Sequence, residues 1–456
     1  MKILICLSII ACKLTRFGLR LLGRGGTDFP GKVALRLSQD VLSVMAQNVT
    51  TVVVTGTNGK TTSSRMLEQC FRAAGLDFFS NKSGANLLSG ITTEFAMNST
   101  ITGRCRKKYA LIECDEAAFR TVSRHLGARC VLVTNVFRDQ LDRYGEITHT
   151  LESIRIGLKN SPSATICLNA DDSLSASLSD TLTQPVVFYG VETEIYHERA
   201  AEVSDAPYCI RCKGEYEYDY VTYGHLGGFR CRSCGYSRPA ASVAVTAVLA
   251  TTPDDSRVLI RAGENTVEAR INLPGGYNIY NACGTVAAAG VMGIPLETSV
   301  QALSDFECGF GRMEKFRIHD VDVRMILVKN PAGCNQVLNF LSNIETPATF
   351  IVCLNDRAAD GTDISWIWDV DFEKLLDMGD RLARLYVSGV RAYDMALRFQ
   401  YAGIPMEKIN VIQDPIALME TATTQGDPVY IMPTYTAMLD LRDRIAKNYG
   451  FKNFWE

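Results

Sequence analysis

The sequence predicts an α/β protein with a parallel sheet in its central part and a second α/β domain toward its C-terminus. Three observations lead to this prediction. Short β-branched runs alternate with helix-length stretches from residue 50 onward, a glycine turn joins the first run to a helix, and a second series begins near residue 315. The chain has 456 residues, two to three times the usual size of a domain, so two or three domains are expected.

Composition excludes several classes of protein. Apolar residues make up 47% and charged residues 21%, so disorder is excluded as the main state. The net charge is −3 and no long basic stripe is present, which argues against a dedicated nucleic-acid binder. Fifteen cysteines, an odd number scattered through apolar runs, indicate a reducing cytoplasm and one metal cluster rather than a disulfide framework.

Residues 1–48 are expected to form a helical lead before the first domain. The run 3–12 resembles a short signal-peptide core, but it is shorter than a membrane-spanning helix and basic residues follow it. An amphipathic helix is predicted, with one apolar face made by Leu14, Phe17, Leu21 and Leu22. We expect the protein to be cytoplasmic. Its first helix is expected to remain uncleaved and either to pack on the body of the protein or to touch the inner surface of the cell membrane.

Two series of strands are predicted. The central domain, 49–314, is expected to contain strands at 51–55, 109–113, 130–134, 164–169 and 185–189. Its helices are expected from about 61 to 74 and at 278–292, and a Tyr-, Gly- and Cys-rich insertion is expected at 205–238. The C-terminal domain, 315–456, is expected to contain strands at 323–328, 349–354, 383–387, 408–412 and 429–432. Strands separated by helix-length spacers indicate parallel sheets covered by helices.

A glycine-rich loop joins the first predicted strand to its helix. Its residues are Gly56, Thr57, Asn58, Gly59, Lys60, Thr61 and Thr62. The backbone N–H groups of such a loop bind phosphate oxygens, the lysine neutralises β- and γ-phosphate charge, and a hydroxyl ligates Mg²⁺. A plain glycine turn would not explain Lys-Thr-Thr. The loop therefore predicts an ATP and Mg²⁺ site.

Acidic residues follow two further predicted strands. Glu113, with Asp115 and Glu116 beyond it, lies at the carboxyl end of a strand, the edge where open α/β sheets bind ligands, and its carboxylate can hold Mg²⁺. The segment 135–145, which contains Asp139 and Asp142, follows another strand. Each acid can instead be a solvated helix start.

Four cysteines form two knuckles separated by 18 residues. They are Cys209, Cys212, Cys231 and Cys234. Four thiolates complete a tetrahedral zinc site and leave no position for water, so this spacing predicts a structural Zn²⁺. Four buried or disulfide-paired cysteines are the alternative. His225 lies between the knuckles and is expected on the surface, because four cysteines suffice.

Five motifs in this order resemble those of the Mur ligases. They are the loop 56–62, the segment 135–145, Asn169-Ala-Asp-Asp172, the segment 276–282 and Gly311-Arg312-Met-Glu314. Mur ligases use ATP to form an acyl phosphate, which an amine attacks. Within the family, the cysteine insertion and the segment 354–369 resemble the MurT ligase subunits of lipid II isoglutaminyl synthase, whose partner GatD is a glutaminase. The resemblance extends from about residue 23 to the C-terminus.

The resemblance implies a Mur-ligase-like central ATPase domain, an inserted four-cysteine zinc ribbon and a Rossmann-like C-terminal domain. It places Lys60 and Thr61 at the ATP phosphates and Mg²⁺, and Glu113 beside the metal. It places Asn278 and Asn281 near the nucleotide and Arg312 near the domain hinge. Gln140 departs from the histidine that many Mur ligases carry there, which puts direct metal ligation at that position in doubt. The UDP-binding domain of other Mur ligases has no counterpart among the roughly 50 residues before the loop, which favours lipid II as a lipid-linked substrate.

Glutamine hydrolysis needs a thiolate, a histidine base and a carboxylate that orients the histidine. The five histidines of this chain do not lie in a cysteine nucleophile turn, so the chain is not expected to hydrolyse glutamine alone. The resemblance implies that a GatD-type partner supplies Cys and His and that Asp363 supplies the carboxylate, with Asp360 and Asp356 as competitors. Asp363 can instead cap the helix start that follows it. The segment 330–335 is expected to be a loop that faces the nucleotide cleft.

Three functions remain open at this point. The leading one is ATP-dependent amidation of the α-carboxylate of D-Glu in the lipid II stem peptide, which gives D-isoglutamine. The second is another Mur-like amide ligase, of the folylpolyglutamate-synthase or cyanophycin type, against which the cysteine knuckles and the segment 354–369 count. The third is a zinc-dependent ATP-binding scaffold without chemistry.

Overall fold

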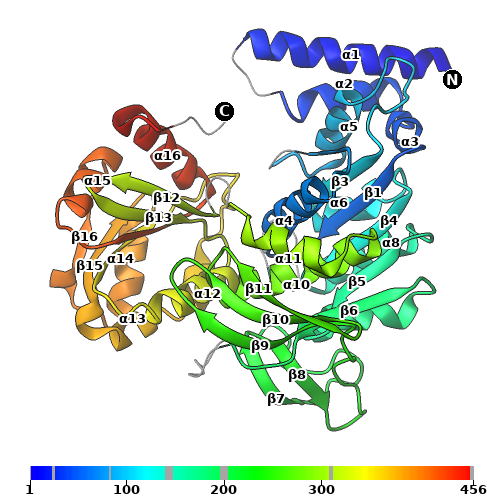
Figure 1. The fold of residues 1–456 in the computed structure, drawn as a ribbon. Helices are drawn as coiled ribbons and strands as arrows, with labels where there is room; N and C mark the ends of the chain where they lie inside the picture. The colour runs from blue at the N-terminus through cyan, green and yellow to red at the C-terminus, as the bar shows by residue number, and fades with distance from the viewer. Residues whose placement is uncertain are drawn as a thin grey trace.

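A computed structural model describes residues 2–22, 26–81, 84–138, 147–195, 204–307 and 312–451. Two large sheets organise these residues, one in the central part of the chain and one in the C-terminal part (Figure 1). The α/β fold with two mainly parallel sheets confirms the predicted fold class.

The central sheet has nine strands in the order β11-β10-β9-β6-β5-β4-β1-β3-β2. Their bounds are β1 Thr50–Thr55, β2 Phe78–Ser80, β3 Tyr109–Glu113, β4 Ala128–Val133, β5 Thr165–Asn169, β6 Val186–Val191, β9 Val243–Thr251, β10 Ser256–Ala262 and β11 Asn265–Ile271. The strands from β1 to β6 pair in parallel, as predicted, and β9 pairs in parallel with β6. The antiparallel pairs β9–β10 and β10–β11 extend the sheet and were not predicted.

Helices cover both faces of this sheet because successive side chains of each strand point to opposite sides. Val52 and Val54 of β1 belong to the apolar cluster that contains the helices α4, α10 and α11, whereas Val53 belongs to the cluster of α5, α6 and α8. The bounds are α4 Lys60–Ala73, α5 Leu88–Met97, α6 Glu116–Val122, α8 Ile147–Lys159, α10 Gly276–Val291 and α11 Leu296–Ser304. A short helix α9 (Ser173–Ser177) and a 3₁₀ turn η1 (Leu178–Thr181) follow β5.

Three helices precede β1. They are α1 Lys2–Leu21, α2 Phe29–Leu37 and α3 Val41–Ala46. Ile5, Ile9 and Cys12 of α1 are buried in the same apolar cluster as α5, so α1 packs on the body and forms the outer edge of the molecule (Figure 1). Of the helices described, none is both long and apolar enough to cross a membrane.

The second sheet has six strands in the order β12-β13-β17-β14-β15-β16. Their bounds are β12 Arg312–Ile318, β13 Val321–Ile326, β14 Ala348–Cys353, β15 Leu382–Ser388, β16 Ile409–Val411 and β17 Val429–Pro433. All pairs are parallel except β12–β13. The five predicted strands are confirmed to within about two residues, and β12 was not predicted.

Helices flank this sheet as well. The main ones are α12 Pro331–Ser342, α14 Ala392–Tyr401, α15 Pro415–Thr423 and α16 Tyr435–Tyr449, and shorter ones are α13 Lys374–Asp377, η2 Ser365–Asp369, η3 Gly379–Arg381 and η4 Met406–Lys408. α12 and α14 pack on one face of the sheet and α15 and α16 on the other. Val337 of α12 lies in the same apolar cluster as Val54 of β1, so one core joins the two sheets.

Candidate active site

The glycine loop between β1 and α4 has a backbone that only glycine tolerates at two positions. Gly56 and Gly59 have φ angles of +117° and +82°. A Cβ on Gly59 would come within 2.0 Å of the Asn281 Oδ1 atom, and one on Gly56 within 2.4 Å of the Thr134 Oγ1 atom. A side chain at either position would push the loop away from α10 or from the end of β4. Both glycines are therefore needed for the close packing of this turn.

Lys60, the first residue of α4, is folded back over the loop. Its ammonium donates to the carbonyl oxygens of Gly56 at 2.5 Å and Thr57 at 3.1 Å, and it lies 2.9 Å from the Glu116 carboxylate. The Lys60 and Glu116 side chains are 10% and 5% exposed. The loop therefore carries a buried cation at the N-terminus of a helix, where anions are stabilised.

Thr61 and Glu113 place two oxygen ligands side by side next to the loop. The Thr61 hydroxyl donates to the Glu113 carboxylate at 3.0 Å. Asn81 holds Glu113 in place, because its side chain accepts from the Glu113 N–H at 2.9 Å and donates to the Glu113 carbonyl at 2.8 Å. Hydroxyl and carboxylate oxygens are ligands that suit Mg²⁺, so this pair fits that ion.

The tip of the loop is held from two sides. The Asn135 side chain accepts from the Asn58 N–H at 2.9 Å and donates to the Asn58 carbonyl at 3.1 Å. Asn330, which caps the N-terminus of α12, donates to the Asn58 side-chain oxygen at 3.0 Å. This last bond connects the N-terminus of α12 directly to the glycine loop.

Asn278 and Asn281 of α10 lie beside α4. Asn281 donates to the Asn278 side-chain oxygen at 3.1 Å and accepts from the Ser63 hydroxyl at 3.3 Å, while Asn278 donates to the Pro274 carbonyl at 2.7 Å. The predicted loop, Glu113 and these two asparagines thus meet at one place. Asp139, Gln140, Asp142, Gly145 and Gly311 lie outside the described residues, and Arg312 is described only as the first residue of β12.

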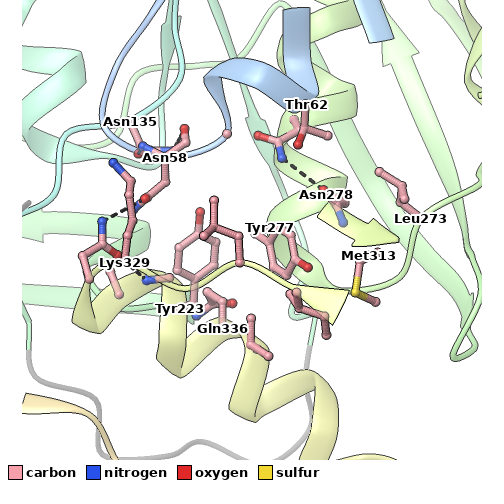
Figure 2. A pocket seen from close by; sticks show the side chains of 18 residues that line it. Asn58, Thr62, Asn135, Tyr223, Leu273, Tyr277, Asn278, Met313, Lys329 and Gln336 are labelled. Atoms are coloured by element: carbon pink, nitrogen blue, oxygen red, sulfur yellow. Dashed lines mark hydrogen bonds between the residues drawn. The ribbon is translucent and has the colours of Figure 1, made fainter. Parts of the chain in front are cut away.

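A cavity of about 820 Å³, including the open space at its mouth, separates the loop from α12 (Figure 2). Asn58, Thr62 and Asn278 line it from the central part, and Lys329 and Gln336 line it from the C-terminal part. Clefts between two domains are common binding sites for small molecules and cofactors. Asn330, Ala332 and Gly333 line this cavity, as expected for the segment 330–335, but the expectation of a loop was wrong, because Asn330 is the N-cap of α12 and the helix begins at Pro331.

Several cavity residues were not predicted from the sequence, among them Tyr223, Lys329 and Gln336. Gln336 is only 3% exposed, and neither its amide nitrogen nor its amide oxygen has a hydrogen-bond partner among the described residues. A buried amide without partners is costly, so its place in the cavity wall suits a polar ligand. No sequence motif marks it.

The four predicted cysteines come together at the base of the hairpin of β7 (Tyr216–Tyr223) and β8 (Leu226–Cys231). All four sulfurs lie within 4.8 Å of one another. Burial acts to raise the pKa of the Cys209 thiol, but the N–H groups of Cys212 and Arg211 outweigh it and lower this pKa to about 7. The cluster therefore has the number and spacing of sulfur ligands that suit Zn²⁺.

The expectation that His225 lies on the surface was wrong. His225 is fully buried at the opposite end of the same hairpin, with its Nε2 atom 3.0 Å from the Asp172 carboxylate. Its ring packs against Phe137 at a centroid distance of 4.5 Å, and Phe137 also stacks on Tyr223. The hairpin tip is therefore inserted into the central domain, where Tyr223 becomes part of the cavity wall.

The three candidate aspartates after β14 differ in their surroundings. Asp360 is buried and accepts from the Thr436 N–H at 2.6 Å, and Asp356 pairs with Arg391 at 2.7 Å. Asp363 is exposed and accepts from the Ser365 N–H at 2.8 Å, a bond that holds its pKa below the usual range. Of the three, Asp363 is the carboxylate that a second chain can reach most easily. The N-cap position of η2 is occupied by Ile364, and Asp363 lies one residue before it with its carboxylate bonded to the first N–H of this turn.

A parallel sheet with a strand–glycine loop–helix phosphate site, faced by a second α/β sheet across a cavity, is the arrangement of the Mur ligase class. The family model for the Mur ligase middle domain matches residues 54–212, and that for the MurT ligase C-terminal domain matches residues 327–438. Among solved structures, a pseudomurein peptide ligase type C from Methanothermus fervidus aligns with a TM-score of 0.66 at 20% identity, over 90% of this chain and 80% of that one. MurF from Acinetobacter baumannii aligns with a TM-score of 0.65 at 15% identity, over 90% and 80%.

Two curated relatives match nearly the whole chain. The lipid II isoglutaminyl synthase (glutamine-hydrolyzing) subunit MurT of Streptococcus pneumoniae is 35% identical over 443 residues, which are 96% of each chain. The subunit of the same name from Staphylococcus aureus strain N315 is 31% identical over 446 residues, 97% of this chain and 98% of the relative. The chain belongs to the MurT family of Mur ligases and is accordingly an ATP-dependent carbon–nitrogen ligase.

Proposed function

We propose that this chain amidates the α-carboxylate of D-Glu in the lipid II stem peptide to D-isoglutamine, with ATP, Mg²⁺ and ammonia from a GatD-type glutaminase subunit. The observation that carries the proposal is the contact between Asn330 and Asn58, which brings the C-terminal domain onto the tip of the phosphate loop. The names of the two MurT relatives, both subunits of a glutamine-hydrolysing synthase, support the acceptor and the need for a partner.

The loop residues Gly56 to Thr62 would bind the ATP phosphates through their N–H groups, and Lys60 would neutralise the transferred phosphoryl group. Thr61 and Glu113 would hold Mg²⁺, which supplies charge stabilisation at the phosphates. Asn278, Asn281 and Gln336 would contact the remainder of the nucleotide, and Arg312 would lie at the hinge between the domains.

The reaction divides into two displacements. A D-Glu carboxylate oxygen attacks the γ-phosphorus of ATP, the bond to the β-phosphate oxygen breaks, and ADP leaves. Ammonia then attacks the acyl carbon, the bond from this carbon to the phosphate oxygen breaks, and the nitrogen loses a proton. Inorganic phosphate and the primary amide are the products. A cation fixed at the loop stabilises the charge that develops in the first step.

Asp363 would complete a glutaminase triad whose cysteine and histidine belong to the partner. Because its pKa is lowered, Asp363 is a carboxylate at neutral pH and can accept a hydrogen bond from a histidine and stabilise the imidazolium. Asp360 and Asp356 are less suited, since each is already engaged within this chain.

We further propose that the cysteine cluster holds a structural Zn²⁺ and that the chain divides at 1–48, 49–314 with the insertion 205–238, and 315–456. The separate sheets and the hairpin support this division. A lipid-linked acceptor would place the enzyme in the cytoplasm at the inner face of the membrane.

The test is amidation by the purified chain with lipid II, ATP, Mg²⁺ and ammonium chloride, followed by mass spectrometry of the product. With an ¹⁸O-labelled D-Glu carboxylate, one labelled oxygen should appear in inorganic phosphate. ATP binding without phosphate release would instead support a scaffold, and amide formation on a different acceptor would support another Mur-like ligase.

A further inference from the structure

Helix α1 has two apolar faces, and only one of them is covered by the rest of the described chain. The covered face carries Ile5, Ile9 and Cys12, which are buried against the body. Arg16 on the same face pairs with Glu94 at 3.0 Å, with both side chains only 8% exposed. These contacts hold α1 firmly along its length, so the direction of its opposite face is determined.

The opposite face is an apolar stripe that runs from one end of α1 to the other. Its residues recur every three or four positions and so cover about a quarter of the helix circumference. They are Ile3, Leu7, Ile10, Leu14, Phe17 and Leu21. Ile3, Leu14, Phe17 and Leu21 are 63–78% exposed. A helix of 20 residues is about 30 Å long, so the outer stripe, as we name it, is extended and nearly straight.

The charges beside the outer stripe all have one sign. α1 contains no Asp or Glu, and Lys2, Lys13 and Arg20 lie along one flank of the stripe. Lys2 and Arg20 are exposed, whereas the half-buried Lys13 ammonium donates to the Ser99 carbonyl at 2.5 Å. Exposed apolar side chains flanked by cations are typical of helices that lie in the surface of an anionic membrane.

We propose that the outer stripe of α1 inserts into the surface of an anionic phospholipid membrane, with Lys2 and Arg20 at the lipid phosphates. The helix would lie flat in the interface and not cross it. Figure 1 places α1 at the outer edge of the molecule, and Ile3, Leu14, Phe17 and Leu21 are each more than 60% exposed there. The positive flank favours anionic lipid over an apolar protein surface as the occupant. This inference rests on α1 alone and not on the proposed reaction.

Flotation of the full chain with vesicles tests the proposal without lipid II or ATP. The protein should float with vesicles of phosphatidylglycerol and phosphatidylcholine in equal parts, and more weakly with pure phosphatidylcholine. Leu14→Glu/Phe17→Glu should weaken binding at least a hundredfold, because each buried side chain contributes at least about tenfold. Arg20→Gln should weaken binding to the anionic vesicles about fivefold.

Tyr393→Glu is the matched control, because Tyr393 is also a large side chain on a helix surface, 70% exposed on α14. This variant should float like the wild type, and all variants should keep the wild-type thermal unfolding midpoint, since the substituted side chains are mainly exposed. Equal flotation of Leu14→Glu/Phe17→Glu and wild type would overturn the proposal. So would a wild-type protein that does not float but forms a dimer that this double variant dissociates, because the stripe would then be a self-association surface.

Discussion

Replacing Lys60 by methionine removes the cation of a buried ion pair, because its ammonium lies 2.9 Å from the Glu116 carboxylate and neither side chain is more than 10% exposed. Breaking such a pair from one side costs roughly 3–5 kcal/mol, since the remaining charge loses its partner in a low-dielectric site. For a cooperative unit of 150–250 residues this corresponds to a fall in Tm of roughly 6–20 °C. Lys60→Met/Glu116→Gln removes both charges and should recover most of this loss.

Activity should respond differently from stability. Both Lys60→Met and the double variant should lose amidation with ammonium by about 10²–10³-fold or more, the effect of removing one group that stabilises transition-state charge. Lys107→Met is the control: Lys107 pairs with Asp77 on the surface, with 38% and 56% of the side chains exposed, so stability and rate should hardly change. Thermal unfolding and the initial rate of amidation measure the two effects. A double variant that is stable and as active as the wild type would refute the assignment of Lys60 to the ATP phosphates.

Three further substitutions test the other parts of the site. In the complex with the glutaminase, Asp363→Asn should abolish amidation with glutamine but leave amidation with ammonium largely intact. The control Asp356→Asn should keep both activities. Loss of both activities in Asp363→Asn would instead place this residue in the ATP or acceptor site. Cys209→Ser should lower the zinc content below one ion per chain and lower Tm. If elemental analysis finds no zinc in wild-type protein prepared with excess metal, the assignment is contradicted. Gln336→Leu should raise the free energy of unfolding by about 1 kcal/mol, because a buried amide without partners is removed. The same variant should raise the KM for ATP about tenfold or more. An unchanged KM would show that Gln336 does not contact the nucleotide.

Much of the fold could be predicted because its signals are local. The five parallel strands from the first series are buried apolar runs followed by turns, and β1 shows the pattern most clearly, with five of its six residues buried. The strands β9, β10 and β11 were missed. All three are partly exposed, and charged side chains interrupt the apolar residues of β10 and β11. The glycine loop was recognised for the same local reason, since its strand, glycines and helix are contiguous.

The remaining parts of the site depend on contacts between distant residues. Lys60 was predicted to bind phosphate, but its pairing with Glu116 joins residues 56 positions apart, and the bond from Asn330 to Asn58 spans 272 positions. No spacing rule relates such residues, because the topology of the sheets brings them together. The sequence gives even less indication of the role of Gln336, because a glutamine on an apolar helix face does not reveal that its amide will have no hydrogen-bond partner.

The burial of His225 shows that the cysteine cluster is not part of an isolated module. Four cysteines complete a tetrahedral zinc site, so His225 between them was not needed as a ligand and was expected on the surface. The hairpin instead carries the four cysteines at one end and, at the other, a tip that contacts Asp172 and Phe137. Because Tyr223 belongs to this tip and lines the cavity, the hairpin contributes directly to the wall of the proposed nucleotide site. The stability of the hairpin and the shape of this site are therefore properties of the same structural unit.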